Sequence, residues 1–568
     1  MHASELPGSS SRQEKQNGSY NWIALSNTTL GVLMASLNSN IILISLPAIF
    51  RGMKIDPLSP GGATYMLWML MGYTVVTATL LVSFGRISDM LGRVRLYNLG
   101  FAIFTAASIL LFLTPGSGTT GILLMILFRL IQGVGAGFLF SNSTAILTDA
   151  FPPQERGMAM GLNQIAGIGG SLLGLILGGV LAEIQWRLVF LVSVPVGLFG
   201  TVWAYLKLKE QSSPDPSQKI DWAGNATFAA GLTLLLLALT YGIMPYGTST
   251  MGWSNPLVVL GIAVGVILLL LFVFLERRVK MPMFHLELFR IRAFACGNIS
   301  LFLSSIARGG LQFTLIIWLQ GIWLPLHGYS FESTPLWSGI YMLPMMIGFF
   351  IMGPVCGKLS DRYGARSFAT GGMLLSVLGF LLLSALPSNF GYGTFLIILF
   401  LLGCGMGMFA APNTTAIMNS VPAEQRGVTS GMRSTLQNTG MALSMTLYFA
   451  ILIVGLAHNL PPILSDGLIH AGVPADVAQR IASMPPTSAL FAAFLGYNPM
   501  GSLIDTATLA SLSSATKTAI LGNQFFPTTI APAVMSSLRL AFYISAALSL
   551  IAAIASSLRG KRYVHGQI

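Results

Sequence analysis

The sequence predicts an all-α membrane protein with fourteen transmembrane helices, and three observations support this fold class. The 568-residue chain is 54% hydrophobic and only 8% charged, whereas a soluble domain carries about 25% charged residues. Its apolar runs are about twenty residues or longer, which is the length of a membrane-spanning helix rather than of a barrel strand. Lysine and arginine are distributed unevenly among the connecting segments, as is typical of membrane proteins.

The apolar runs define the spans, and two uncharged stretches are long enough to hold two helices each. Trp222–Leu275 is broken around MPYGTSTMGWSNP, and Ser367–Ala423 is broken at LPSNFGYGT, because Pro, Gly and Asn favour turns. In chain order the predicted spans lie at residues 24–48, 64–84, 96–113, 121–147, 157–181, 188–207, 222–243, 257–275, 293–319, 334–356, 367–386, 393–418, 428–455 and 534–557.

The basic residues orient these spans. With the N-terminus inside, the inner segments hold most lysines and arginines, and the outer segments hold only Arg51, Lys54, Arg187, Arg480 and Lys517. Because positively charged loops tend to stay in the cytoplasm, we expect a multi-pass protein of the cell membrane with both termini cytoplasmic. The net charge of +12 is then a property of topology, and we expect no nucleic-acid partner.

The chain also contains an internal repeat. GRISDMLGRVR (85–95) recurs as GKLSDRYGAR (357–366), and QGVGAGFLFSNSTAILTDAFPPQERG (132–157) recurs as LGCGMGMFAAPNTTAIMNSVPAEQRG (402–427), at an offset of about 270 residues. Two six-helix halves separated by two inserted helices would produce this offset, and such parallel repeats place a substrate between the halves. The predicted organisation is a tail at 1–22, a first half at 23–208, the inserted pair at 209–292, a second half at 293–558 and a tail at 559–568.

Several motifs in this order resemble the major facilitator superfamily, and in particular its fourteen-helix drug:proton antiporter branch. They are the loop signature at 85–95, FRLIQGVGAG (128–137), GGSLLGLILGG (169–179), WRLVFLVSVPVG (186–197) and DWAG (221–224). The resemblance covers residues 24–455 and the last helix. It implies the major facilitator fold and secondary active transport by alternating access, with export of hydrophobic or amphipathic compounds.

The duplicated loop signature predicts a gate. Asp89 suits a helix N-terminus, which favours a carboxylate, and Arg93 is expected to reach Asp149 at the inner end of the fourth span. The resemblance implies that this cluster locks the inner gate in the outward-facing state; the alternative is a solvated loop that only orients the helices. The predicted gate residues are Gly85, Asp89, Gly92, Arg93 and Asp149, with Gly357, Asp361 and Arg362 in the second copy.

Three glycines mark the fifth span. Gly170, Gly174 and Gly178 recur every four residues on one helix face, and small residues at this spacing let helices approach closely. The resemblance implies a bending fifth helix that closes the cavity outside. Plain helix packing explains the spacing equally well.

Polar residues within spans predict a substrate cavity, because a charge or amide in hydrocarbon is costly and usually faces water or a partner. Four basic residues lie within spans: Arg129, Arg308, Arg433 and Arg539. Arg129 matches the arginine of the family's fourth helix, and Arg308 lies near mid-membrane; either could instead satisfy carbonyls of a broken neighbouring helix. The predicted cavity residues are Asn38, Asn40, Arg129, Gln132, Asn142, Asn163, Arg308, Gln320 and Asn438.

Asn38 stands where the first helix of the resembled branch often carries an aspartate. An amide does not titrate, and none of the 18 acidic residues falls at mid-membrane. We therefore expect weak or absent proton coupling by this route.

One segment differs from the rest. Residues 457–533 carry charged, Pro, Ser and Thr residues and are predicted as an external loop, which is either a cap over the exit or passive. Within it, TSALFAAFLGYN (487–498) is apolar but too short to span a bilayer, so an interfacial position is expected.

These observations predict a transporter of the multidrug efflux type and not an enzyme. The alternative is an exporter of a lipid-like or anionic substrate with weak or no proton coupling, and a channel or scramblase fits least because the gate signature is duplicated. The three cysteines and six histidines form no ligand pattern, so no metal and no cofactor are expected. The expected partners are a small hydrophobic or amphipathic substrate, or a lipid, and the surrounding membrane lipids, with the protein as a monomer.

Overall fold

The computed structural model describes residues 8–56, 61–115, 117–152, 156–210, 221–247, 249, 251–279, 282, 284–422, 426–494 and 498–560. Within these ranges the regular elements are helices, apart from one isolated bridge between Tyr246 and Ser249. Fourteen of the described helical segments are long and apolar enough to cross a membrane. The all-α fold and the number of spans are thus confirmed.

The first half contains six spans, and its sixth consists of two short helices in succession. Its elements are α1 (Gly8–Met53), α2 (Gly62–Leu91), α3 (Arg93–Phe112), α4 (Thr119–Ala150), α5 (Arg156–Ile184), α6 (Leu188–Leu191) and α7 (Ser193–Lys207). Two inserted helices follow, α8 (Trp222–Gly242) and α9 (Pro256–Glu276). A side chain caps the start of each helix: Asp221 accepts a hydrogen bond from the Gly224 backbone N–H, and Asn255 accepts one from the Leu257 backbone N–H. Each cap satisfies a free N–H of the first turn.

The second half begins with a short 3₁₀ helix and contains the remaining spans. Its elements are η1 (Leu286–Arg290), α10 (Arg292–Gly309), α11 (Leu311–Trp318), the π-helical η2 (Leu319–Trp323), α12 (Leu324–Leu326), α13 (Thr334–Tyr341), α14 (Leu343–Tyr363), α15 (Ala365–Ala385), α16 (Tyr392–Asn419), α17 (Arg426–His470) and α23 (Phe525–Ser557). Elements α10 to α12 form one interrupted span, and α13 and α14 form the next.

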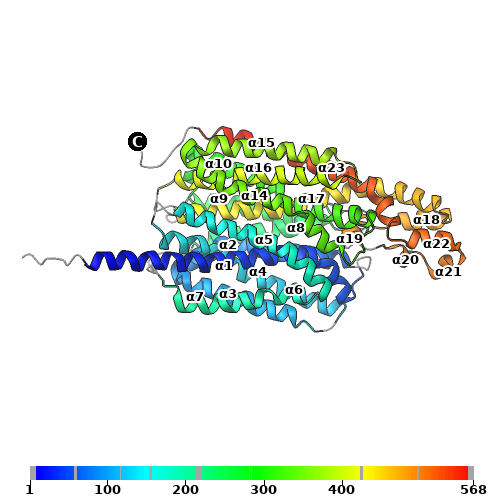
Figure 1. Ribbon diagram of the computed structural model, residues 1–568, viewed down its shortest axis with the longest axis horizontal. Helices are drawn as coiled ribbons and strands as arrows, with labels where there is room; N and C mark the ends of the chain where they lie inside the picture. Colours follow the sequence, from blue (N-terminus) through cyan, green and yellow to red (C-terminus); the bar gives the residue numbers. More distant parts are fainter. Residues whose placement is uncertain are drawn as a thin grey trace, which may run out of the picture.

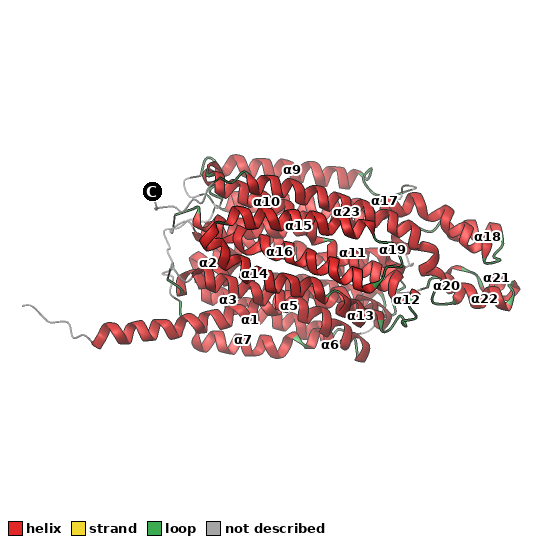
Figure 2. Ribbon diagram, turned by 45° about the horizontal axis from the view of Figure 1, so that its top comes forward, coloured by secondary structure: helices red, strands yellow, loops and turns green. Residues whose placement is uncertain are grey.

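The bundle has two distinct ends. In Figure 1, α1 begins and α23 ends toward the left, while α18, α21 and α22 project beyond the bundle on the right. We call these the terminal end and the far end. Figure 2 shows α9 along the outer edge of the bundle, and α8 contributes Phe228 to a hydrophobic cluster with Val75 of the first half and Ile417 of the second. The inserted pair therefore lies beside both halves without separating them.

The structure corrects the predicted loop at 85–95. Helix α2 continues to Leu91, and only Gly92 separates it from α3. Gly92 has a φ of 104° and Gly364, between α14 and α15, has a φ of 87°. Glycine adopts this region without the steric penalty of other residues, so one residue is enough to reverse the chain in each half.

The structure also corrects the external loop at 457–533, which is largely helical. Helix α17 continues to His470 and α23 begins at Phe525, and between them lie α18 (Ala475–Ala482), α19 (Pro486–Phe494), α20 (Met500–Leu503), α21 (Thr506–Ser511) and α22 (Ser514–Leu521). The two long helices contact each other beyond the predicted spans, since a Cβ on Gly467 of α17 would lie 2.7 Å from Thr529 Cγ2 of α23. Nearer the bundle, Asn459 Nδ2 donates to Ser536 Oγ at 3.1 Å. In this segment, Asp505 accepts hydrogen bonds from Thr508 and lies beside Arg480, which keep the pKa of its carboxyl below the ordinary value.

Helix α19 covers most of the apolar run at 487–498 and is buried against the rest of the protein. Ala489, Leu490, Ala492 and Ala493 of α19 are at most 2% exposed. The Ala493 carbonyl is so close to Gly321 of η2 that a Cβ on Gly321 would lie 2.5 Å from it. The short helix is buried because it fills the groove beside the π-helical turn, where apolar side chains leave water.

Candidate functional site

A cavity of about 490 Å³ lies between the two halves. The first half lines it with α1, α2, α4 and α5, and the second half with α10, α11, α14, α16 and α17. On α4 and α16, which end at the terminal end, the lining residues fall in the last part of the helix; on α5 and α17, which begin there, they fall in the first part. The cavity therefore extends from mid-bundle toward the terminal end.

The lining combines flexible apolar side chains with neutral polar ones. Eight of the described lining residues are methionines: Met71, Met160, Met345, Met346, Met406, Met418, Met441 and Met445. The rest of the wall includes phenylalanines, asparagines, glutamines and serines, together with threonines and aliphatic residues. Methionine is unbranched and adapts to irregular shapes, so such a wall can accommodate more than one apolar ligand.

Two arginines give the cavity its charge. Arg308 is in the last turn of α10, and Arg433 is on α17. Arg433 Nη1 donates to Thr414 Oγ1 at 3.3 Å and to Gln437 Oε1 at 3.2 Å, both neutral groups. The described lining contains no aspartate or glutamate, so this part of the chain leaves the cavity with a net positive charge.

The far end of the bundle is closed. A Cβ on Gly179 of α5 would lie 2.5 Å from Leu336 Cα of α13, and one on Gly339 of α13 would lie 3.0 Å from the Leu175 carbonyl oxygen. These backbones belong to opposite halves, and the surrounding side chains, such as Ile42 and Ile317, are fully buried. The described residues thus seal the halves together beyond the cavity.

Four of the predicted cavity residues line the cavity: Asn40, Asn163, Arg308 and Asn438. Asn163 Nδ2 donates to Ser143 Oγ at 3.0 Å, which joins two lining residues from α5 and α4. Asn438 and Asn40 bond to carbonyls one turn earlier in their own helices. Their amide oxygens have no hydrogen-bond donor among the described residues and are free to meet a ligand.

Asn38, Arg129 and Gln132 do not line this cavity; they form a buried network behind its wall. Arg129 Nη1 donates to Asn38 Oδ1 and to Gln132 Oε1, each at 2.6 Å. Asn38 Nδ2 donates to Ser193 Oγ at 3.0 Å and Gln132 Nε2 to Ser108 Oγ at 2.8 Å. The Arg129 guanidinium also lies 4.6 Å from the ring centre of Tyr73, which does line the cavity. The network therefore joins α1, α3, α4 and α7 as packing contacts.

Asn142 and Gln320 are also absent from the cavity wall. Asn142 Nδ2 donates to the Phe138 carbonyl at 2.9 Å, and Gln320 Nε2 donates to Ser338 Oγ at 2.8 Å. Both side chains are at most 1% exposed. Asn142 thus donates within its own helix and Gln320 donates to α13, while the amide oxygens of both are buried without a hydrogen-bond partner among the described residues.

Several cavity residues were not predicted from the sequence, above all Arg433, Gln437 and Gln164. A signal for them exists on α17, where Ser430, Arg433, Ser434, Gln437 and Met441 recur at helical spacing and all line the cavity. Arg433 follows Asn163 by the repeat offset of about 270 residues. Comparing equivalent faces of the two halves would have found it.

The three predicted glycines of α5 lie against α1. A Cβ would come within 2.3 Å of the Leu33 carbonyl at Gly170, 2.4 Å of the Leu37 carbonyl at Gly174 and 2.8 Å of the Ile41 carbonyl at Gly178. This stripe leaves no room for a side chain, because the two backbones touch.

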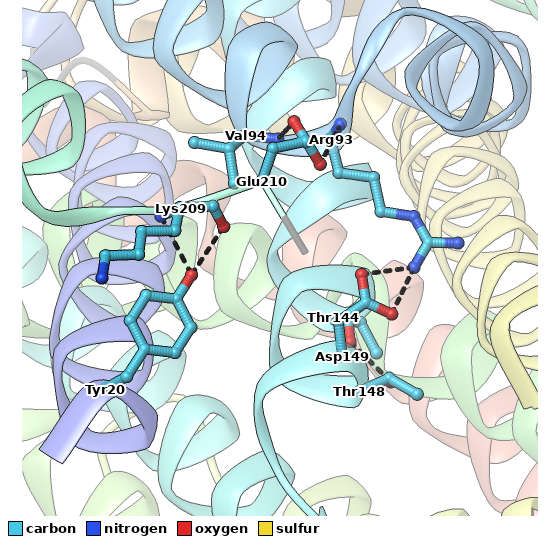
Figure 3. Close-up of polar contacts among 8 residues, drawn as sticks. All are labelled: Tyr20, Arg93, Val94, Thr144, Thr148, Asp149, Lys209 and Glu210. Atoms are coloured by element: carbon cyan, nitrogen blue, oxygen red, sulfur yellow. Dashed lines mark hydrogen bonds and ion pairs between the residues drawn. The ribbon is translucent and has the colours of Figure 1, made fainter. Parts of the chain in front are cut away.

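Figure 3 shows the predicted gate at the terminal end. Arg93 Nη1 lies 2.7 Å from both carboxylate oxygens of Asp149, the acid that the sequence analysis assigned to it. The carboxylate at the N-terminus of α3, however, belongs to Glu210, which accepts from the backbone N–H of Arg93 at 3.1 Å and of Val94 at 2.9 Å. The Tyr20 hydroxyl donates to the neighbouring Lys209 carbonyl at 2.7 Å. Through Lys209 and Glu210, these contacts hold the residues that follow α7 against the first half.

The remaining predicted gate residues are placed less fully. Gly85 and Gly357 lie inside helices, with open space beside Gly85. Arg362 is exposed and its guanidinium lies 5.5 Å from the ring centre of Tyr363. The side chains of Asp89 and Asp361 lie outside the described residues. As for metals, no three His, Cys, Asp or Glu side chains come together within the described chain.

Comparison with known proteins shows which family has this architecture. The sequence profile described as Major Facilitator Superfamily matches residues 28–275 and 223–445. The chain is 28% identical over 443 residues to the riboflavin transporter RibZ of Clostridioides difficile, covering 77% of this chain and 90% of that one. It is 29% identical over 443 residues to the multidrug resistance protein Stp of Mycobacterium tuberculosis, covering 78% and 77%.

Among solved structures, an auto-inhibited POT family peptide transporter matches with a TM-score of 0.58 at 14% identity, covering 97% of this chain and 99% of that one. This likeness concerns the fold alone. Since the family profile matches well over half of the sequence, the chain belongs to the major facilitator superfamily.

Proposed function

We propose that this protein is a secondary transporter that exports small hydrophobic or amphipathic compounds by alternating access. The observation that carries the proposal is the cavity between the halves, which extends toward the terminal end and is sealed at the far end. A carrier needs a central site that is accessible from one side at a time, and rocking of the halves would exchange the sides. The methionine-rich wall suits ligands of varied shape.

The relatives support this proposal at the level of substrate class. One is named a riboflavin transporter and the other a multidrug resistance protein, which favours small organic molecules as cargo. The fourteen spans and the distribution of Lys and Arg favour a cell-membrane location with both termini in the cytoplasm. In that orientation the cavity is accessible from the cytoplasm, where an exporter loads its substrate. Membrane lipids surround the protein, which we propose acts as a monomer.

In this proposal the cluster of Arg93, Asp149 and Glu210 has a different role from that of the predicted gate. The Arg93–Asp149 pair joins α3 to α4 within one half and is formed while the cavity extends toward the terminal end. The pair therefore does not break whenever that end opens. We infer that, with Glu210, it keeps this corner of the first half rigid, so that the half moves as one body.

Proton coupling through the cavity is weak or absent in this proposal. The described lining has no carboxylate, and Asn38 is engaged by Arg129 and Ser193. A carrier that couples to protons usually needs a titrating group in its cavity.

Locking the far end tests alternating access. A Cβ on Gly339 would lie 3.7 Å from the Leu175 Cβ, within the roughly 3.5–4.5 Å that a disulfide requires. The double variant Leu175→Cys and Gly339→Cys, without the three native cysteines, is reconstituted in proteoliposomes. Counterflow of a fluorescent dye into preloaded vesicles is then measured.

Oxidation should stop counterflow and reduction should restore it, while each single variant remains active. Dye binding should persist in the oxidised protein, because the cavity remains accessible from the terminal end. Counterflow that continues in the fully crosslinked protein would contradict alternating access and favour a channel.

A further inference from the structure

We propose that Arg308 and Arg433 form an oxyanion site, so that the preferred cargo is an amphipathic organic anion rather than a cation. This inference rests on the proposed transport function and names the chemical class of its substrate. It concerns the cavity wall of the second half, where the two arginines come from α10 and α17.

Arg308 is the stronger part of the argument. It lines the cavity, yet its Nε is buried without a hydrogen-bond partner among the described residues, and neither an ion pair nor a side-chain hydrogen bond joins its guanidinium to another described group. A guanidinium Nε that is buried with its donor unused is costly. The C-terminal end of α10, which carries a partial negative charge, favours the cation but leaves the guanidinium donors free for a ligand.

Arg433 supplies a second cation to the same cavity. Its partners Thr414 and Gln437 are uncharged, and it lies within electrostatic range of Arg308. Two positive charges that share a cavity repel each other, and an anion between them would relieve both the repulsion and the missing hydrogen bonds. Guanidinium groups bind carboxylate and similar oxyanions through paired N–H donors.

The other lining residues indicate the chemistry of the uncharged part of the ligand. Met345, Met346 and Phe349 of the second half and Phe140 of the first supply apolar surface, and Asn163 and Gln164 face the arginines' cavity from α5. A hydrophobic ring system with one anionic group would satisfy both parts. A cationic drug would find two arginines and no described carboxylate.

A matched pair of dyes tests the charge preference. Fluorescein and rhodamine 123 share a planar xanthene ring but differ in sign of charge, and their binding is measured by fluorescence anisotropy on purified protein in phosphatidylcholine nanodiscs. We expect fluorescein to bind more tightly. Arg308→Gln and Arg433→Gln should each weaken fluorescein binding about tenfold or more, the effect of losing a charge-assisted hydrogen bond, and leave rhodamine 123 binding unchanged or stronger.

Arg539→Gln is the control, because it removes the same charge from an exposed position on α23 outside the cavity. It should change neither affinity. Equal affinity for the two dyes, or equal loss of both in folded Arg308→Gln and Arg433→Gln proteins, would overturn the oxyanion site. Gel filtration and thermal unfolding verify that the variants are folded.

The source of the anion is decided by competition. Displacement of fluorescein by short-chain phosphatidylglycerol, but not by short-chain phosphatidylcholine, would support a lipid headgroup at the same site. Displacement only by soluble aromatic carboxylates would support a free organic anion. Crosslink-sensitive counterflow of rhodamine 123 without any for fluorescein would leave the transport function standing and contradict this inference alone.

Discussion

Arg129 donates a 2.6 Å hydrogen bond to Asn38, and both residues are at most 1% exposed. This contact occupies the position on the first helix where the resembled branch often carries an acid. The arginine is thereby used to join helices behind the wall, and the amide is no longer available to the cavity.

Arg129→Ala should therefore reduce stability more than ligand affinity. The change leaves the amide oxygens of Asn38 and Gln132 without their donor, and a buried unsatisfied acceptor costs about 1–3 kcal/mol. We expect a clearly lower Tm of the purified protein, with dye affinity within a few-fold of the parent. Arg308→Ala is the contrasting variant and should change affinity at nearly constant Tm. Loss of dye binding in Arg129→Ala at unchanged Tm would place Arg129 in the ligand site instead.

Asn38→Asp should leave the charge preference of the cavity unchanged. The new carboxylate would lie beside Arg129 and would form an ion pair with it, so that no negative charge would be added to the cavity. We expect the same ratio of fluorescein to rhodamine 123 affinity and no new pH dependence of transport between pH 5 and 9, the range in which an isolated carboxyl in a low-dielectric site can titrate. A pH-dependent variant that prefers cations would mean that this position faces the cavity during the cycle.

Asp149→Asn should impair transport without impairing binding. Its pair with Arg93 is partly exposed, with 26% and 20% of the two side chains accessible, so its loss should cost less than about 1 kcal/mol of stability. We expect counterflow several-fold slower at unchanged dye affinity, because the corner of α3 and α4 is no longer fixed. Asp149→Glu, which keeps the charge, should retain most of the rate. Lost binding in a folded Asp149→Asn protein would refute the proposed gate role.

Two glycines of α5 offer a matched test of helix contact. Gly174→Ala would bring a Cβ to 2.4 Å from the Leu37 carbonyl oxygen, whereas Gly169 has no atom within 4 Å of the equivalent position. Overpacking should destabilise Gly174→Ala by about 1–3 kcal/mol. Gly169→Ala should be neutral or gain up to about 1 kcal/mol from helix propensity. Thermal unfolding of both variants compares them, and equal Tm values would show that α1 and α5 separate at no cost.

The sequence by itself determined the all-α membrane fold, the fourteen spans and the repeat that marks the two halves. Each of these depends on local or periodic properties of the chain. A span needs about twenty apolar residues whatever its neighbours are, and an ancestral duplication remains visible as a fixed offset. The partner of Arg93 was also predictable, because consecutive spans cross in opposite directions, which brings the start of α3 and the end of α4 to the same side of the membrane.

The lengths of α17 and α23 were not predictable in the same way. Their continuation beyond the predicted spans depends on contacts with each other, such as Gly467 with Thr529, rather than on hydropathy. The buried position of α19 likewise depends on the groove beside Gly321, which exists only once the ninth span has folded with its π-helical turn.

Only the tertiary structure decided which polar side chains face the cavity. Asn38 and Asn40 are two residues apart on one helix, and at about 100° per residue they point to nearly opposite sides. One meets Arg129 and the other lines the cavity. Helix α1 carries apolar residues around much of its surface, because most of it is buried against neighbouring helices. The pattern along a single helix therefore does not reveal which side faces the cavity; the packing of the two halves against each other determines it.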